Sequence, residues 1–179
     1  MTASPLYERP LADEYAPYYE RYVARVPVGP IPLQLKRQIE ETVGQLHTVR
    51  ADKALYTYAP GKWTVKEVVG HLADTERVMA YRALRFARND RTELPGFDEQ
   101  TYTPEGKFNE RSLKDLLQEF RTVRAATVVL FEGMPLESLM RTGTANGQKV
   151  SVRALGYIIA GHELHHLAIL NDNYRSIFA

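Results

Sequence analysis

Four long segments of the chain carry apolar residues at every third or fourth position, and this spacing constrains the fold more than any other feature. They cover roughly residues 32–49, 64–88, 112–133 and 151–170. Side chains three and four residues apart lie on one face of an α-helix, so each segment is expected to form an amphipathic helix. Such helices bury their apolar faces against one another. Because the sequence shows no run of strands, the pattern predicts an all-α fold, a four-helix bundle.

Local signals mark two helix starts and one turn. Thr64 and Glu67 have the spacing of a capping box, which favours a helix start at this point. Ser151 is a typical N-cap for the last helix. Just before it, Asn146-Gly147 is a strong signal for a tight turn. We therefore expect a small hairpin between the third and fourth helices.

The first 30 residues differ from the rest because they are rich in Tyr and Pro. Proline interrupts helices, so this part allows only a short helix, over about residues 13–24. We divide the chain into an N-terminal extension, residues 1–30, and a bundle domain, residues 31–179. The longest connector, residues 89–110, is where we expect a lid that faces a substrate.

Composition excludes several classes of protein. The net charge is +1, so the basic excess of a nucleic-acid-binding protein is missing. The chain has no cysteine, which excludes disulfides, thiolate metal ligands and a cysteine nucleophile. The first residues lack the basic and apolar regions of a signal peptide, and no apolar stretch reaches the ~18 residues of a membrane span. We expect a cytoplasmic protein with no membrane or nucleic-acid partner.

The densest chemical signal is the run from His162 to His166, which reads HELHH. Residues i and i+4 lie one turn apart on one helix face, so His162 and His166 can present two imidazoles to one ion. The pair His162 and His165, at i and i+3, is possible but less favoured. A catalytic zinc site normally has three protein ligands and an open position.

The third ligand is expected to be His71 rather than His47. His71 lies among apolar core positions of the second helix, whereas His47 lies near the end of the first. Metal sites in bundles are built from facing helices. The sequence thus predicts a divalent metal ion on His71, His162 and His166, with zinc or nickel favoured because imidazole suits both.

The same residues match the HExxH motif of zinc metalloproteases, in which the glutamate is the general base. Three features argue against that reading. No His or Glu follows His166, and Ile169 stands where the extended motif has a glycine. The chain also lacks strands that could pair with a peptide. Glu163 is instead expected to point away from the site, toward Arg153 or solvent.

Other residues near the histidine motifs have two readings. Asp74 lies one turn from His71 and could orient it, but a solvent-facing position is favoured. Trp63, Phe97 and Tyr102 could line the mouth of a pocket, although most aromatic residues belong to the core.

Three segments together resemble the DinB family, especially its YfiT-like branch. Residues 61–76 read GKWTVKEVVGHLADTE, residues 94–99 read LPGFDE and residues 161–166 read GHELHH. The resemblance covers roughly residues 31–172 and implies a four-helix bundle with a three-histidine metal site, matching His71, His162 and His166. It implies nothing about the first 30 residues.

The family includes metal-dependent hydrolases and transferases that join low-molecular-weight thiols to electrophiles. We favour a thiol S-transferase acting on small electrophiles, because a site among helices offers no strand edge to a peptide while a small thiol can enter. A metal-dependent hydrolase of small molecules and a non-catalytic, stress-related metal-binding bundle are the alternatives. The resemblance also implies a homodimer.

Overall fold

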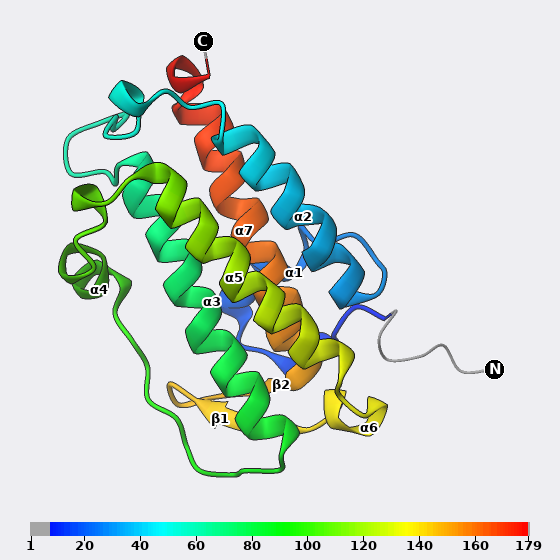
Figure 1. The fold of residues 1–179 in the computed structure, drawn as a ribbon. Helices are drawn as coiled ribbons and strands as arrows, with labels where there is room; N and C mark the ends of the chain where they lie inside the picture. Colours follow the sequence, from blue (N-terminus) through cyan, green and yellow to red (C-terminus); the bar gives the residue numbers. More distant parts are fainter. Residues whose placement is uncertain (1–7, 179) are drawn as a thin grey trace.

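The computed structural model describes residues 8–178 and confirms the four-helix bundle (Figure 1). The long helices agree with the predicted segments to within a few residues at each end. Shorter elements join them: a one-turn helix near the N-terminus, a helix in the longest connector, and a one-turn helix and a hairpin before the last long helix. The helices are α1 (Glu20–Val23), α2 (Ile31–Leu46), α3 (Val65–Ala87), α4 (Glu99–Glu105), α5 (Leu113–Glu132), α6 (Leu136–Leu139) and α7 (Val152–Asn173).

The predicted caps are present. The hydroxyl of Thr64 accepts a hydrogen bond from the amide of Glu67 at 3.1 Å, and the carboxylate of Glu67 accepts one from the amide of Thr64 at 2.7 Å. Ser151 Oγ accepts from the amide of Ala154 at 3.0 Å. These bonds satisfy amide groups that have no partner inside the helix, and they fix where α3 and α7 begin.

The predicted hairpin is also present. Strands β1 (Thr142–Ala145) and β2 (Gln148–Ser151) pair antiparallel. Asn146 has φ 52° and Gly147 has φ 69°, so both turn residues adopt the left-handed region that a type I′ turn requires. The chain after α3 packs against the hairpin. The amide of Leu94 donates to the carbonyl of Thr144 at 3.0 Å, and the carbonyl of Leu94 accepts from the amide of Asn146 at 2.9 Å.

The connector after α3 contains an element that the sequence did not predict. Helix α4 follows Asp98, whose side chain accepts from the amide of Gln100 at 2.9 Å. The helix has only seven residues. Thr103 is its one buried residue, so the sequence has no apolar stripe that would have predicted this helix.

The N-terminal segment runs along α7 rather than away from the bundle. The helix expected over residues 13–24 is reduced to two 3₁₀ turns and α1, and one of these turns begins at Pro17. Arg9 anchors the segment by donating to the carbonyls of Val23 at 2.7 Å and Val26 at 2.8 Å. Residues 1–7 of the expected extension lie outside the described residues. They include Met1–Pro5, where the sequence shows no signal-peptide pattern.

The bundle core consists of two apolar clusters separated by a layer of buried polar side chains. Along α3 the first cluster ends at Ala73 and the second begins at Met79. Polar residues at the matching level of α3, α5 and α7 are buried, with Glu76 3%, Arg124 1% and Glu163 1% exposed. No helix within residues 8–178 is both long and apolar enough to cross a membrane.

Candidate metal centre

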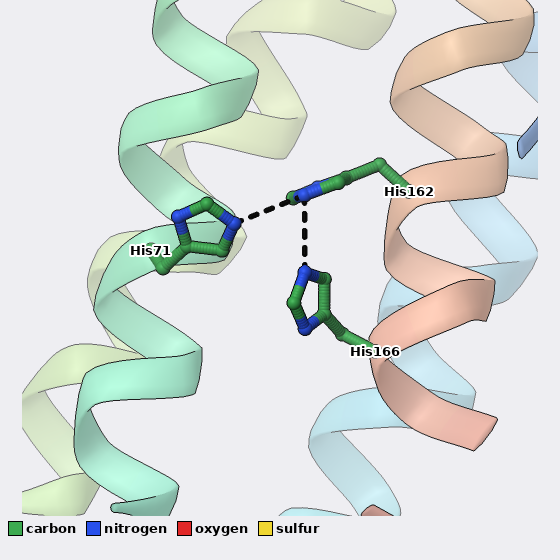
Figure 2. A group of neighbouring side chains, drawn as sticks. All are labelled: His71, His162 and His166. Carbon is green, nitrogen blue, oxygen red and sulfur yellow. Dashed lines mark hydrogen bonds between the residues drawn. The ribbon is translucent and has the colours of Figure 1, made fainter. Parts of the chain in front are cut away.

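Three histidine side chains meet in the buried polar layer, one from α3 and two from α7 (Figure 2). His71 Nε2 lies 3.0 Å from His162 Nε2, and His166 Nε2 lies 3.1 Å from the same atom. The exposed fractions are 6% for His71, 7% for His162 and 9% for His166. The structure therefore brings together the three residues that the sequence selected.

Hydrogen bonding alone does not account for this arrangement. The Nε2 atom of a neutral imidazole either donates one hydrogen or offers one lone pair in the ring plane. His162 Nε2 faces two other Nε2 atoms at once, so one of the two contacts lacks a well-directed partner. A cation that accepts a lone pair from each ring satisfies all three. Ligand atoms of a tetrahedral zinc site lie about 3.3 Å apart, close to the observed spacings.

The surroundings keep the rings neutral, which is the form that binds metals. Burial lowers the pKa of His71 to about 4. Burial, with a further contribution from His71 and His165, lowers the pKa of His166 to about 3. Burial and the neighbouring imidazoles hold the pKa of His162 well below its usual range. All three lone pairs are therefore available at neutral pH.

Aromatic side chains fix the orientation of the rings. Trp63 packs against His71 with ring centroids 4.6 Å apart and is nearly parallel to the ring of His166 at 6.3 Å. Tyr22 of α1 meets His162 edge to face at 5.3 Å. Thr75 Oγ1 lies 3.4 Å from His71 Nδ1, on the far side of that ring. The histidine cluster is thus held on several sides.

The cluster lies in the wall of a pocket of about 520 Å³. One face of α3 lines it, together with α7, the N-terminal segment over residues 16–22, the connector over residues 96–100, and the hairpin turn. A cavity of this size holds a small organic molecule. The arrangement places three potential metal ligands where such a molecule can reach them.

Comparison with known proteins assigns the family. The family model described as the DinB superfamily matches residues 34–170. A protein of Oceanobacillus iheyensis, named as a candidate metal-dependent hydrolase, is 30% identical over 135 residues, which are 73% of this chain and 74% of that protein. The chain belongs to the DinB superfamily.

Solved structures agree on the fold of this DinB superfamily member. YfiT from Bacillus subtilis, described as a candidate metal-dependent hydrolase with an unusual four-helix bundle topology, aligns with a TM-score of 0.69 and 14% identity, covering 97% of this chain and 95% of YfiT. The mycothiol-dependent maleylpyruvate isomerase aligns with a TM-score of 0.61 and 14% identity, covering 78% of this chain and 58% of that enzyme. At these identities the likeness concerns the fold alone.

The remaining residues that the sequence singled out occupy varied positions. His47 is exposed at the end of α2 and lies outside the histidine cluster. His165 is half-buried on the pocket wall, edge to face with Tyr22 at 5.4 Å. Asp74 is half-buried and pairs with Arg77 at 3.2 Å.

Two of the three aromatic residues proposed for the pocket mouth line the pocket. These are Trp63 and Phe97. Tyr102 is not part of the lining; its ring packs against Phe97 at 5.5 Å and is 48% exposed. The connector expected to face a substrate does contribute to the pocket, through residues 96–100.

The expected partner of Glu163 was wrong. Glu163 does point away from the pocket, but it is buried and pairs with Arg124 of α5 at 2.8 Å. Arg124 also donates to both carboxylate oxygens of Glu76. Arg153 pairs instead with Glu14 of the N-terminal segment. Glu163 and Arg153 are ten residues apart on one helix, a separation of roughly 15 Å, so they cannot meet.

Sequence reasoning missed two groups of pocket residues. The tyrosines Tyr18, Tyr19 and Tyr22 form one wall, and Arg82 lines the pocket further along α3. The signal for Arg82 was available, since it lies eleven residues after His71 and eleven residues are close to three helical turns. No sequence signal indicated that the tyrosines belong to the same cavity.

Proposed function

We propose that this protein is a metal-dependent enzyme that uses a divalent ion on His71, His162 and His166 to activate a small nucleophile, and that the reaction is the transfer of a low-molecular-weight thiol to a small electrophile. The observation that carries the proposal is the convergence of three buried Nε2 atoms at the wall of a pocket. Zinc and nickel are the ions that best suit three imidazoles.

A divalent ion with three neutral ligands keeps an open position and lowers the pKa of water or a thiol bound there. The protein supplies the rest of the site. Trp63 and Tyr22 hold the rings in place, and the three histidine side chains are buried in the wall of the pocket. Besides helices, two loop segments and the hairpin turn line the pocket, and the edge of β1 is already paired with Leu94. The pocket therefore suits a small molecule better than a peptide strand.

Thiol transfer is the favoured reaction for two reasons. A thiol is a soft ligand for zinc or nickel, and the chain has no cysteine of its own to compete for the ion. One protein with the same fold, the mycothiol-dependent maleylpyruvate isomerase, is thiol-dependent by name. With an epoxide acceptor the sulfur forms a bond to a ring carbon, the C–O bond breaks and the oxygen takes up a proton. With a chlorinated acceptor the sulfur forms a bond to carbon and the C–Cl bond breaks. Chloride leaves, and the thiol proton passes to solvent.

Hydrolysis of a small ester or amide is the second candidate. It is favoured by the name of the relative from Oceanobacillus iheyensis, which calls that protein a candidate metal-dependent hydrolase. An ion on the same three histidines could bind water instead of a thiol, and water would then be the nucleophile. The two reactions differ in what is consumed, so one assay separates them.

The metal is tested first by elemental analysis of untagged protein. We expect about one divalent ion per chain in the wild type and none in the triple variant His71→Ala, His162→Ala, His166→Ala. His47→Ala is the matched control and should keep the ion, because His47 lies outside the cluster. Metal-free wild type should also gain thermal stability when zinc is added. Equal metal content in wild type and triple variant contradicts the site.

The reaction is tested with zinc-loaded protein and two panels of substrates. One panel combines thiols resembling glutathione, mycothiol and bacillithiol with a chlorinated or epoxide acceptor. The other contains esters and amides. Thiol consumption that requires His71 and His162 supports transfer. Ester or amide cleavage with the same requirement, and no thiol consumption above background, overturns transfer in favour of hydrolysis.

A further inference from the structure

Arg82 differs from the other deeply buried arginines of the protein. Arg124 pairs with two carboxylates, and so does Arg153. Arg82 is only 4% exposed, yet it forms no ion pair with any residue of the described part of the chain. A buried guanidinium without a countercharge is costly, so an unpaired one at a pocket wall indicates a missing anion.

The contacts of Arg82 orient it without neutralising it. Its Nη2 donates to the carbonyl of Pro95 at 2.8 Å, and its Nη1 lies 3.5 Å from Met79 Sδ. Its guanidinium carbon lies 5.9 Å from the ring centre of Phe97. The hydroxyl of Tyr19 also lies beside the guanidinium. A carbonyl, a thioether, a phenol and an aromatic ring thus hold the group in place, and none of them carries a countercharge.

The position of Arg82 relates it to the histidine cluster. His71, Thr75, Met79 and Arg82 follow one another at spacings of four, four and three along α3, and all line the pocket. Eleven residues of helix correspond to roughly 16 Å between the Cα atoms of His71 and Arg82. Long helical side chains lean toward the N-terminus, so the side chains of His71 and Arg82 lean the same way and the guanidinium stays well separated from the cluster along the pocket.

The charges around the pocket favour a singly charged anion. The lining contains two arginines, Arg21 and Arg82, and one carboxylate, Glu99. Glu99 makes no ion pair with either arginine. Apart from the metal ion and its bound thiolate, the side chains of the lining carry one net positive charge, and a carboxylate matches the planar fork of a single guanidinium.

We propose that the ligand of this pocket carries a carboxylate that pairs with Arg82, about three helical turns along α3 from the group that reacts at the three histidines. The reacting end rests on the proposed function, whereas the carboxylate end rests on Arg82 alone. Arg82 is thus a specificity residue that selects acidic over neutral molecules of the same length.

Two probes of equal length test the inference. Both 6-mercaptohexanoate and 6-mercaptohexanol carry a thiol for the metal, but only the first has a carboxylate at the far end. Binding to zinc-loaded protein can be followed by the fluorescence of Trp63, the one tryptophan of the chain, which lines the pocket. We expect the acid to bind about 10- to 100-fold more tightly than the alcohol, because a hydrogen-bonded ion pair forms only with the acid.

In Arg82→Gln this preference should disappear, while the affinity for the alcohol stays unchanged. Arg82→Lys keeps the charge and should keep part of the preference, which guards against a folding defect in the glutamine variant. Arg50→Gln changes an exposed arginine that pairs with Asp52 and serves as the control with full preference. Equal binding of both probes by the wild type, or an undiminished preference in Arg82→Gln, overturns the inference.

A separate measurement distinguishes failure of this inference from failure of the proposed function. If neither thiol binds, metal-assisted thiol binding is wrong. Hexanoate and hexanol are then compared on metal-free protein. Hexanoate binding that is lost in Arg82→Gln supports the carboxylate site independently of the metal. No difference between hexanoate and hexanol on the wild type refutes it.

Discussion

Replacing Gly161 with alanine tests how closely the N-terminal segment is fitted to α7. Gly161 directly precedes His162, and a Cβ atom at this position would lie 2.0 Å from the carbonyl oxygen of Tyr22. Real Cβ contacts do not fall below 3.0 Å, so α1 has to move by at least 1.0 Å, the difference between the two distances. The obstacle is backbone, which cannot rotate aside as a side chain does.

The size of the effect follows from two opposing terms. Alanine in a helix interior is favoured over glycine by about 1 kcal/mol. Forcing extra volume into a packed contact costs about 1–3 kcal/mol. Gly44→Ala is the matched control, because Gly44 lies in α2 and a methyl group added there would have no neighbouring atom within 4 Å. The gain in helix propensity is common to both variants. The difference between their free energies of unfolding therefore reports the contact with Tyr22 alone.

The assay is equilibrium unfolding in urea, combined with hydrogen exchange of the amides in α1. We expect Gly44→Ala to be more stable than the wild type and Gly161→Ala to be less stable than Gly44→Ala by about 1–3 kcal/mol. Exchange over residues 20–26 should be faster only in Gly161→Ala, since α1 is displaced. Equal stability and equal exchange in the two variants would refute close packing of α1 on α7.

Three further predictions follow from other contacts. Arg124→Leu leaves Glu76 and Glu163 buried without their cation, so the free energy of unfolding in urea should fall by about 3–5 kcal/mol. The control Arg121→Gln removes a pair at the surface, and its free energy of unfolding should fall by less than about 1 kcal/mol. Although burial raises the pKa of Glu14, hydrogen bonds from Arg153 and Ser151 lower it below its usual value overall. The wild type should therefore be more stable than Glu14→Gln above about pH 4.5, and this difference in unfolding free energy should shrink when unfolding is measured at lower pH. Light scattering at tens of micromolar should show a homodimer, and a monomer contradicts that prediction.

The sequence was sufficient for the long helices and for the histidine cluster, because both depend on local periodicity. The spacing of His162 and His166 decides that they share a face of α7, whatever packs against it. His71 could be paired with them only because its apolar neighbours on α3 require that face to point inward. These are consequences of helix geometry, and the structure retains them.

What could not be predicted depends on how separate elements meet. The partner of Glu163 is Arg124, which lies 39 positions earlier, and no local rule relates the two helices. Tyr22 of the N-terminal segment packs on His162, but nothing in the spacing of the tyrosines predicted this contact. The predicted homodimer rests on family resemblance alone.

The three histidines come from the long helices, whereas much of the pocket wall comes from segments outside them: residues 16–22, 96–100 and the turn of the hairpin. Substitutions in these outer segments change the lining of the cavity without changing the sequence of α3 or α7. The metal ligands and much of the cavity's shape are therefore encoded in different stretches of chain, while Arg82 ties part of the choice of ligand to α3. Exchanging the outer segments between relatives should therefore change which sizes and shapes of ligand fit, while the three histidines and Arg82 stay in place.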